Sequence, residues 1–444
     1  MNEIEKTKDK KRILLLIIGI ILIVGLISFL VIGYYNYEEN NTSSNTSSVT
    51  NTSSTSLNSY TIIKGGTYNI TGNYECITIN TQDKVELILT DANITCTSGP
   101  AINIKSAEKV EVVLEGENII TSVTTEEEDG AIYSKEDLIL SGNGTLTISS
   151  NYDGIVSKDN LIIDSGTYLI NSSDDGIRGR DSVEITGGSF TINAGGDGIK
   201  STNDEDTLKG YINITGGTFT INSEGDGIQA ETNLNITNGD FKIKTTGNAS
   251  TDSAKGVKAG VLIKVDGGTY SINSSDDGIH SNGNITINKG EFTINSGDDG
   301  IHGDGMVELN DGTFSITAHE GIEGTYVKIN DGTINISASD DGINAGNKSD
   351  TYSVTIEING GYITIKMESG DTDAIDSNGS LYVNGGTLDI TAGSPFDYDG
   401  TSKYSGGTII VNGTTTNQIT NQMMGGMPFD QNNNQRGQQG RGMR

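Results

Sequence analysis

The chain has 444 residues, including 60 Gly, 3 Pro and no Trp, and this composition excludes packed helical domains and favours short strands broken by frequent turns. Asp and Glu number 59 against 28 Lys and Arg, which gives a formal net charge of −31. Such a charge repels nucleic-acid phosphates and anionic lipid surfaces, so we expect no nucleic-acid partner.

The N-terminal part of the chain has the pattern of a membrane anchor. The apolar run at residues 13–33, ILLLIIGIILIVGLISFLVIG, is long enough to span a bilayer, and the segment 1–12 before it ends in Lys10, Lys11 and Arg12. Positive charge in front of the run predicts that segment 1–12 is cytoplasmic. We therefore expect a single-pass protein of the cell membrane with an extracellular C-terminal domain; cleavage as a signal peptide, which would give a secreted protein, is the alternative.

Two polar segments bracket the remaining chain. Residues 34–59 are rich in Ser, Thr and Asn, show no apolar spacing that could build a core, and predict a linker. Residues 413–444 are rich in Asn, Gln and Gly and predict a disordered polar tail. The folded domain is therefore expected at 60–412.

A short motif, Asp-Gly-Ile or a close variant, recurs through this domain. Successive motif glycines are 21 to 24 residues apart, except for two intervals of 29 that carry the insertions NDEDTLKG and TTGNASTDSAKG, as expected where extra residues lie in turns. A period of about 22 residues indicates a solenoid of stacked coils. The motif glycines are Gly130, Gly154, Gly176, Gly198, Gly227, Gly256, Gly278, Gly300, Gly321 and Gly342.

Each repeat predicts three short strands, because apolar and polar residues alternate over short runs separated by Gly and Asn. One coil cannot bury its apolar face alone, so successive coils must stack with their strands in parallel, and parallel crossover connections are right-handed. The fold class expected is therefore all-β, a right-handed parallel β-helix. Its interior would hold an aliphatic column (Ile155, Ile177, Ile199, Ile228, Val257, Ile279, Ile301, Ile322, Ile343) and an aromatic column (Tyr168, Phe190, Phe219, Phe241, Tyr270, Phe292, Phe314).

Cys76 and Cys96 are the two cysteines of the chain and lie 20 residues apart, close to one coil. Neighbouring coils would bring them within disulfide reach, and an extracellular location permits the bond. Two unpaired thiols packed as small apolar side chains are the alternative, and the spacing leaves both open.

The recurring Asp is open to two interpretations. In the first it is a turn residue, with Gly supplying a positive φ and Asp bonding its own backbone. In the second, carboxylates stacked about 5 Å apart repel one another and hold a cation, for which Ca²⁺ with its oxygen ligands is the natural choice. The residues predicted to ligate Ca²⁺ are Asp175, Asp181, Asp197, Asn203, Asp277, Asp299, Asp304 and Asp341.

The residue after the buried Ile points outward by alternation, and in this acidic chain it is often basic. Arg178, Lys200, Lys258, His280 and His302 form a predicted stripe, called here the basic stripe. Such side chains could grip carboxylated sugars, with Ca²⁺ bridging the sugar and the protein. Charge compensation of the neighbouring Asp residues is the alternative, and zinc is not expected because histidines are few.

Signals for catalysis are thin. No nucleophile elbow or Ser/His/Asp spacing stands out. A polysaccharide lyase would use Ca²⁺ to acidify the proton beside a uronate carboxylate and a basic side chain to remove it, which makes Arg178, Lys200 and Lys258 conceivable bases. Enzyme activity is therefore an open question, with binding favoured over cleavage.

The stretch GAIYSKEDLILSGNGTLTISSNYDGIVSKDNLIIDSGTYLINSSDDGIRGRDSVEITGGSFTINAGGDGIKS, residues 130–201, resembles the extracellular carbohydrate-binding β-helix family of cellulolytic anaerobic bacteria. The similarity runs over most of residues 60–412. It implies a right-handed β-helix similar in shape to pectate lyases, bound Ca²⁺, and binding of cellulose or acidic plant-wall sugars such as polygalacturonate. It departs at Lys255 and at His319-Glu320, where the Asp pair is lost.

Three function classes follow. The first is a cell-surface carbohydrate-binding protein that recognises plant-cell-wall polysaccharides with the help of Ca²⁺. The second is a calcium-dependent pectate lyase on the same fold. The third is a structural or adhesive surface protein.

Overall fold

The computed structural model describes residues 46–50, 58–123, 130–248, 253–368 and 372–421. The chain divides into two units, Met1–Ser47 and Ser48–Arg444, and the described residues 58–421 lie in the second. The predicted anchor at 13–33 lies outside the described residues. Within the described ranges, no helix is long and apolar enough to cross a membrane.

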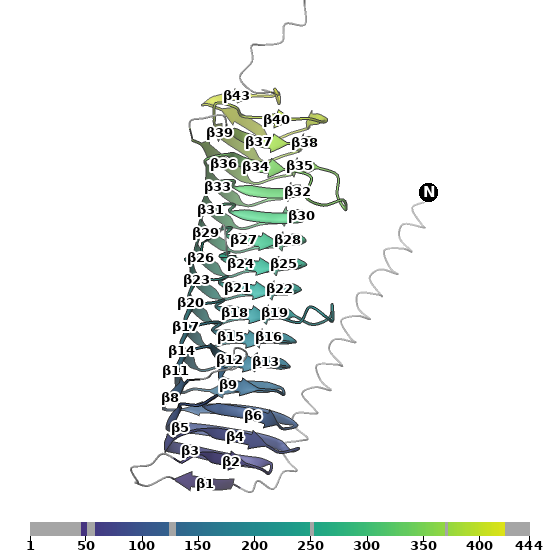
Figure 1. The fold of residues 1–444 in the computed structure, drawn as a ribbon. Helices are drawn as coiled ribbons and strands as arrows, with labels where there is room; N and C mark the ends of the chain where they lie inside the picture. The colour runs from purple at the N-terminus through teal and green to yellow at the C-terminus, as the bar shows by residue number, and fades with distance from the viewer. Residues whose placement is uncertain (1–45, 51–57, 124–129, 249–252, 369–371, 422–444) are drawn as a thin grey trace, which may run out of the picture. The chain divides into compact units, whose positions relative to one another are not determined.

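In the second unit the chain runs in coils of three short strands that stack one on another (Figure 1). Strands of successive coils pair in parallel: β11 pairs with β8 of the coil before it and with β14 of the coil after it, and Ile148 lies opposite Ile120 and Ile170. The result is one continuous sheet with three faces. The predicted stack of parallel three-strand coils is confirmed, while its right-handed sense stays a prediction.

The strands are grouped here by face. The first face holds β2 (Tyr60–Ile62), β4 (Ile77–Asn80), β6 (Ile102–Ser106), β9 (Gly130–Ser134), β12 (Asp153–Ser157), β15 (Ile177–Gly179), β18 (Ile199–Ser201), β21 (Ile228–Ala230), β24 (Val257–Ala259), β27 (Ile279–Ser281), β34 (Asp341–Ala345), β37 (Asp373–Ser377) and β40 (Asp397–Tyr398). The second holds β7 (Lys109–Glu115), β10 (Leu138–Gly142), β13 (Asn160–Ile163), β16 (Ser182–Ile185), β19 (Tyr211–Ile214), β22 (Asn233–Ile236), β25 (Leu262–Val265), β28 (Asn284–Ile287), β35 (Thr355–Ile358), β38 (Ser380–Val383) and β41 (Ser402–Tyr404).

The third face holds β8 (Glu117–Ser122), β11 (Thr145–Ser150), β14 (Thr167–Ser172), β17 (Ser189–Ala194), β20 (Thr218–Ser223), β23 (Asp240–Thr245), β26 (Thr269–Ser274), β29 (Glu291–Ser296), β31 (Thr313–Ala318), β33 (Thr333–Ala338), β36 (Tyr362–Met367), β39 (Thr387–Thr391) and β42 (Thr408–Val411), with β43 (Thr414–Thr416) antiparallel to β42. Four strands run across a corner between faces: β3 (Gly66–Tyr74), β5 (Lys84–Cys96), β30 (Ile301–Leu309) and β32 (Ile322–Ile329). One strand, β1 (Thr46–Thr50), lies within the predicted linker.

The core consists of ladders of identical or similar side chains. Both predicted columns are buried, with every member at most 3% exposed. In the aromatic column, successive rings from Tyr168 to Phe314 stack with centroids 4.5–5.0 Å apart and planes within 7° of parallel. The ring spacing matches the strand spacing of a sheet, so each coil adds one ring to a continuous stack.

The motif glycines have a different role from the one predicted. Gly278 does not have a positive φ; a Cβ there would lie 2.6 Å from the carbonyl oxygen of Gly300 in the next coil and would also clash with Ile294. The positive φ values fall instead at a second recurring glycine, such as Gly312 with φ 131°, just before the aromatic strand. The motif glycine therefore serves close packing between coils, and the other glycine makes the turn.

The structure also shows where the two cysteines and the first insertion lie. Cys76 and Cys96 form a disulfide with their Cα atoms 5.0 Å apart, which decides between the two alternatives. The insertion at 203–210 lies between β18 and β19, outside the strands, as expected.

Replacing a ring within the aromatic stack should destabilise the fold strongly. We expect Phe241→Ala to lower the free energy of unfolding by about 3–5 kcal/mol, because it removes a buried ring and leaves a cavity between two others. Chemical denaturation of the variant and the wild type measures this difference. Lys242→Ala, at the exposed neighbouring position, is the control and should change stability by less than about 0.5 kcal/mol; equal effects would contradict the ladder's role.

Candidate functional site

A column of buried carboxylates follows the corner before the first face. Asp153, Asp175, Asp197 and Asp226 occupy this position in successive coils, and none is more than 7% exposed. Each uses Oδ1 to accept a backbone N–H from the next coil: the N–H of Asp175 reaches Asp153 at 3.0 Å, and that of Asp197 reaches Asp175 at 2.8 Å. The Asp therefore links coils together and does not bond its own turn, which corrects the first interpretation of the motif.

The basic stripe lies beside this column and neutralises it. Lys200 Nζ lies 2.7 Å from Asp197 Oδ2 and 3.5 Å from Asp175 Oδ2, Arg178 pairs with Asp153, and Lys258 Nζ lies 3.3 Å from Asp226 Oδ2. In each of these coils, one carboxylate oxygen bonds to the backbone and the other faces a cation. The charge-compensation alternative is thus the arrangement that the structure contains.

These ion pairs limit the contacts that the cations of the basic stripe can make with a ligand. The side chains of Arg178, Lys200 and Lys258 are only 17%, 27% and 22% exposed. Burial by itself would lower the pKa of Lys200, but Asp197 and Asp175 outweigh it and raise the pKa above the usual lysine value. A raised pKa keeps the amine protonated, which is unfavourable for a lyase base.

Further along the stripe, imidazoles replace the longer cations. His280 Nδ1 lies 2.7 Å from Asp277 Oδ2, and His302 Nδ1 lies 2.6 Å from Asp299 Oδ2 and 3.0 Å from Glu323 Oε2. Burial lowers the pKa of His302, but its bonds to Asp299 and Glu323 prevail and raise it to about 10. The same contact with His302 holds the pKa of Glu323 at about 2, against the effect of burial.

The remaining predicted metal ligands of the insertion corner are also engaged. Asp181 accepts hydrogen bonds from Asn203 Nδ2 and Lys209 Nζ, both at 2.5 Å. Asn203 Oδ1 accepts the backbone N–H groups of Glu205 and Asp206, so it caps the inserted loop. In these contacts Asp181 is paired with the Lys209 ammonium and hydrogen-bonded to Asn203, so the side chains satisfy one another.

Towards the C-terminal coils, the charge of the stripe reverses. In register after His302 come Glu323, Asn344, Asp376 and Asp397. Among the described residues, no Lys, Arg or His lies within ion-pair distance of Asp376. The motif in the sequence carries the stripe as far as Glu323 and Asn344, but not to Asp376, because the next coil begins 32 residues later and has Ala374 where the motif has Gly.

Asp341 lies in the same region, where carboxylates have no basic partner among the described residues. Burial, followed by repulsion from Asp376 and Glu320, raises the pKa of Asp341 to about 8. Beside it, Asn344 donates its amide to Glu320 Oε2 at 2.9 Å, while its buried Oδ1 has no hydrogen-bond partner. Of the eight predicted metal ligands, Asp341 alone lies where carboxylates gather without a basic partner among the described residues.

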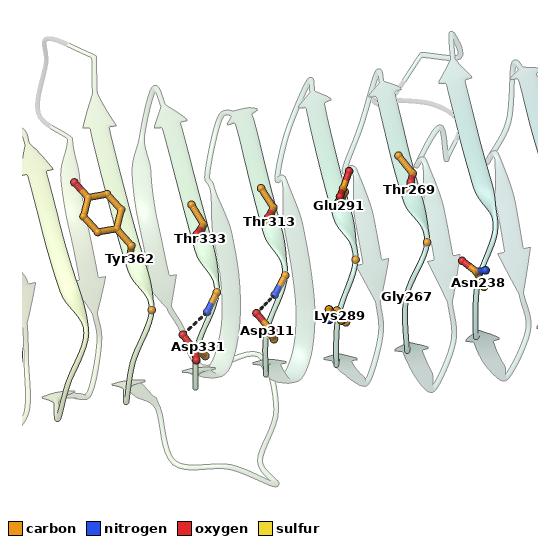
Figure 2. A pocket seen from close by; sticks show the side chains of 15 residues that line it. Asn238, Gly267, Thr269, Lys289, Glu291, Asp311, Thr313, Asp331, Thr333 and Tyr362 are labelled. Carbon is orange, nitrogen blue, oxygen red and sulfur yellow. Dashed lines mark hydrogen bonds between the residues drawn. The ribbon is translucent and has the colours of Figure 1, made fainter.

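A second candidate site lies on the outside of another corner, before the third face. A trench of about 680 Å³ crosses successive coils there, and two rows of side chains line it (Figure 2). One row holds Thr269, Glu291, Thr313, Thr333 and Tyr362, and the other Asn238, Lys289, Asp311 and Asp331. Tyr362, at one end, is 48% exposed. We call this surface the corner trench.

A ladder of asparagines supports the corner trench along one side. Asn310, Asn330, Asn359 and Asn384 each donate their side-chain amide to the asparagine of the coil before, at 2.7–3.0 Å, beginning with Asn288. This ladder of hydrogen bonds fixes the positions of the turns that carry the trench side chains. The sequence contains a signal for this site, the repeated Asn-Asp-Gly-Thr at 310–313 and 330–333, but it recurs in fewer coils than the Asp-Gly-Ile motif.

Comparison with known proteins shows what the chain is similar to. A family model described as carbohydrate-binding domain-containing protein matches residues 56–300 and 298–424. A protein of that description from Acetivibrio thermocellus is 34% identical over 113 residues, which are 22% of this chain and 40% of the relative, so the chain spans well under half of that protein's length. A solved structure, of the polysaccharide lyase-like protein from C. thermocellum as a gadolinium derivative, is 29% identical, covers 55% of this chain and 95% of its own, and has a TM-score of 0.39.

The buried carboxylates predict a definite pH dependence. Burial raises the pKa of Asp153 from 3.8 to about 7, although Arg178 opposes the shift. The native state therefore holds more protons than the unfolded state between these values, and the free energy of unfolding should fall as the pH rises from about 4 to about 7, by up to about 4 kcal/mol from this group. Denaturation at a series of pH values, with a chelator present, measures the slope.

The matched variants are Asp153→Asn and Asp350→Asn. Asp153→Asn keeps the acceptor for the backbone of Asp175 but removes the titration, so its slope should be smaller than that of the wild type. Asp350 is exposed on a loop, and its replacement should leave the slope unchanged. A wild-type slope of opposite sign would refute the assignment.

Proposed function

The chain belongs to the carbohydrate-binding domain-containing protein family, and on this premise we propose that it is a polysaccharide-binding protein whose glycan lies in the corner trench. The observation that carries the proposal is the trench itself, an open polar surface that repeats once per coil. Plant-wall polysaccharides, cellulose or acidic sugars such as polygalacturonate, are the proposed targets. The predicted anchor at 13–33 would present the domain outside the cell membrane.

The chemistry of the corner trench suits a chain of hydroxyl groups. Asp311 and Asp331 each accept the N–H of the glycine that follows, at 2.7 and 2.8 Å, which holds the carboxylates in place (Figure 2). Carboxylate oxygens accept hydrogen bonds from sugar hydroxyls, and the threonines both donate and accept. The coil spacing of about 4.8 Å is comparable to one sugar residue in an extended chain, so contacts can repeat along it. Tyr362 offers an exposed ring on which a sugar face can stack.

Acidic sugars require a different contact. The basic stripe, predicted to grip them, is committed to the buried Asp column, and the corner trench offers the single cation of Lys289 against Glu291, Asp311 and Asp331. A uronate chain would therefore need bridging metal ions to approach. This favours a neutral glycan such as cellulose as the main ligand, with polygalacturonate binding dependent on Ca²⁺.

The residues of the C-terminal coils fit a calcium ion better than those of the N-terminal coils. Glu320, Asp341 and Asp376 supply carboxylate oxygens, and the unpartnered Oδ1 of Asn344 supplies a neutral oxygen, which is the donor set that Ca²⁺ prefers. Bound there, the ion would neutralise the carboxylates of Asp341 and Asp376, which have no ion-pair partner in the part of the chain that the structure describes. We therefore place the proposed Ca²⁺ at these four residues, with Asp341 retained from the sequence prediction.

Binding to insoluble polysaccharide tests the proposed function. We expect the purified full chain, in detergent, to sediment with cellulose in the presence or absence of Ca²⁺, and with calcium-crosslinked polygalacturonate only when Ca²⁺ is present. Tyr362→Ala should weaken cellulose binding about tenfold, because it removes the stacking ring. Tyr362→Phe keeps the ring and should bind almost as the wild type does.

Leu208→Ala, which removes an apolar side chain that is 83% exposed outside the trench, is the control and should leave binding intact. No sedimentation with either polysaccharide would contradict the proposal. Release of unsaturated, ultraviolet-absorbing sugars from polygalacturonate would instead show that the protein is a lyase.

Calcium should stabilise the full chain through the C-terminal carboxylates. We expect Ca²⁺ at about 100 times its dissociation constant to raise the free energy of unfolding by about 2.7 kcal/mol, because the ion binds the native state alone. Asp376→Asn should remove most of this gain, whereas Asp175→Asn, in a coil neutralised by Lys200, should keep it. A gain lost in Asp175→Asn and kept in Asp376→Asn would place the ion in the N-terminal coils instead.

A further inference from the structure

A second groove lies at the opposite edge of the third face from the corner trench. It has a volume of about 640 Å³ and follows the C-terminal ends of β11, β14, β17 and β20. The rows of the corner trench instead precede or begin strands further along the stack, such as β31 and β33. Among the described residues, the two grooves share none of their lining. We call the second one the amide groove; its lining includes Asn171, Asn193 and Asn222 near the strand ends and Ser173, Gly195 and Glu224 in the turns that follow.

The three asparagines of the amide groove retain hydrogen-bonding capacity for a ligand. Asn193 donates its side-chain amide to Asn171 Oδ1 at 2.9 Å, and Asn222 donates to Asn193 Oδ1 at 3.0 Å. An asparagine side chain has two N–H donors and a carbonyl oxygen with two lone pairs, and this ladder uses one donor and one lone pair of Asn193. All three side chains are exposed. Asn193 therefore keeps one donor and one acceptor that can face a molecule in the groove.

The lining of the amide groove is polar and almost without charge. Of the described residues that line it, Glu224 alone is charged, although the whole chain has a formal net charge of −31. A uronate or a phosphate would therefore meet no Lys or Arg in this described lining. Sugar hydroxyls both donate and accept hydrogen bonds, so they match amide and serine side chains without an ion pair. The chemistry of the groove thus favours a neutral polyhydroxyl ligand over an anion.

The groove is open to a polymer that runs along the stack. A Cβ at Gly195 would lie 2.3 Å from the backbone carbonyl oxygen of Ser173, so this turn has no room for a side chain. The asparagines recur at the strand spacing of about 4.8 Å, and each coil presents the same amide to a ligand chain. Repeated weak contacts of this kind suit a long glycan better than a single sugar.

We propose that the amide groove is a second polysaccharide-binding site, which takes a neutral glycan through Asn171, Asn193 and Asn222. The class of ligand rests on the proposed function, whereas the binding residues are separate from those of the corner trench. A protein with two such grooves binds a glycan at two points, and each attachment raises the effective concentration of the other. No aromatic residue is among the described lining of the amide groove, so its own affinity should be lower than that of the trench with Tyr362.

Affinity electrophoresis tests the amide groove. The full chain, in non-ionic detergent, runs through native gels that contain hydroxyethylcellulose, a soluble neutral glucan, at a series of concentrations, and its retardation relative to a protein that does not bind gives the affinity. We expect Asn171→Leu/Asn193→Leu to weaken binding at least about tenfold, because the change of two amides to apolar groups leaves the trench as the single attachment. Adding Tyr362→Ala to this pair should abolish the retardation.

Asn273→Leu/Asn295→Leu is the matched control. These two asparagines occupy the same places in β26 and β29, Asn295 donates to Asn273 at 2.9 Å, and both lie outside the lining of either groove. The control pair should bind as the wild type does. Wild-type affinity in folded Asn171→Leu/Asn193→Leu, or an equal loss in the control pair, would overturn the proposal.

The same gels separate this site from the corner trench. A loss in Asn171→Leu/Asn193→Leu with wild-type affinity in Tyr362→Ala would support the amide groove and contradict the trench, and the reverse result would overturn the amide groove and leave the trench in place. Circular dichroism establishes folding. If the Leu pair unfolds, Ser173→Arg decides, because it places a long side chain over the groove from an exposed turn without changing the ladder; it should weaken binding to the same extent, and wild-type affinity would overturn the proposal.

Discussion

The fold depends on the parallel stacking of near-identical coils at the spacing of β-strands. Stacking places each side chain on its counterpart in the next coil, so an apolar position becomes a ladder and a charged position becomes a column of like charge. For Phe190, Phe219 and Phe241 this is favourable, because rings stack face to face. For Asp175 and Asp197 it is unfavourable unless a partner intervenes. The arrangement of the carboxylate column and its partners follows from how the chain compensates these stacked charges.

In the N-terminal coils, groups of the protein itself compensate the stacked carboxylates. The backbone of the next coil binds one carboxylate oxygen, and a cation three residues along the chain, such as Lys200 for Asp197, faces the other. The C-terminal coils do not, because the cation position becomes Glu323, Asn344 and Asp376. Between these two regions, His280 and His302 occupy the same position. The column thus passes from pairs with lysine and arginine, through imidazole, to Asp376, which has no basic partner among the described residues, and the proposed calcium site lies in this last part.

The period of the sequence was sufficient to predict the coils, the three strands and the buried columns, because burial and alternation act locally and repeat. The period alone did not predict which groups the charged side chains pair with. The spacing of Asp197 and Lys200 was compatible with an ion pair between them and equally with a Lys200 side chain free to bind a sugar. The directions of the side chains across neighbouring coils decide between these two arrangements. The continuation at Asp376 escaped because Ala374 interrupts the motif. The corner trench escaped because only two of its coils share Asn-Asp-Gly-Thr, at 310–313 and 330–333, and other coils have different residues at the same places.

By itself, the sequence determined that the chain folds as stacked parallel coils, which residues form the ladders, and that carboxylates gather at one corner. Those properties depend on composition, alternation and period, which can be read along the chain. Only the tertiary structure decided that Cys76 and Cys96 are bonded, that the motif glycine serves packing between coils, and that the basic stripe neutralises the Asp column. The reason is physical: each of these depends on the contact between one coil and the next, where distances of a few ångströms decide which groups pair.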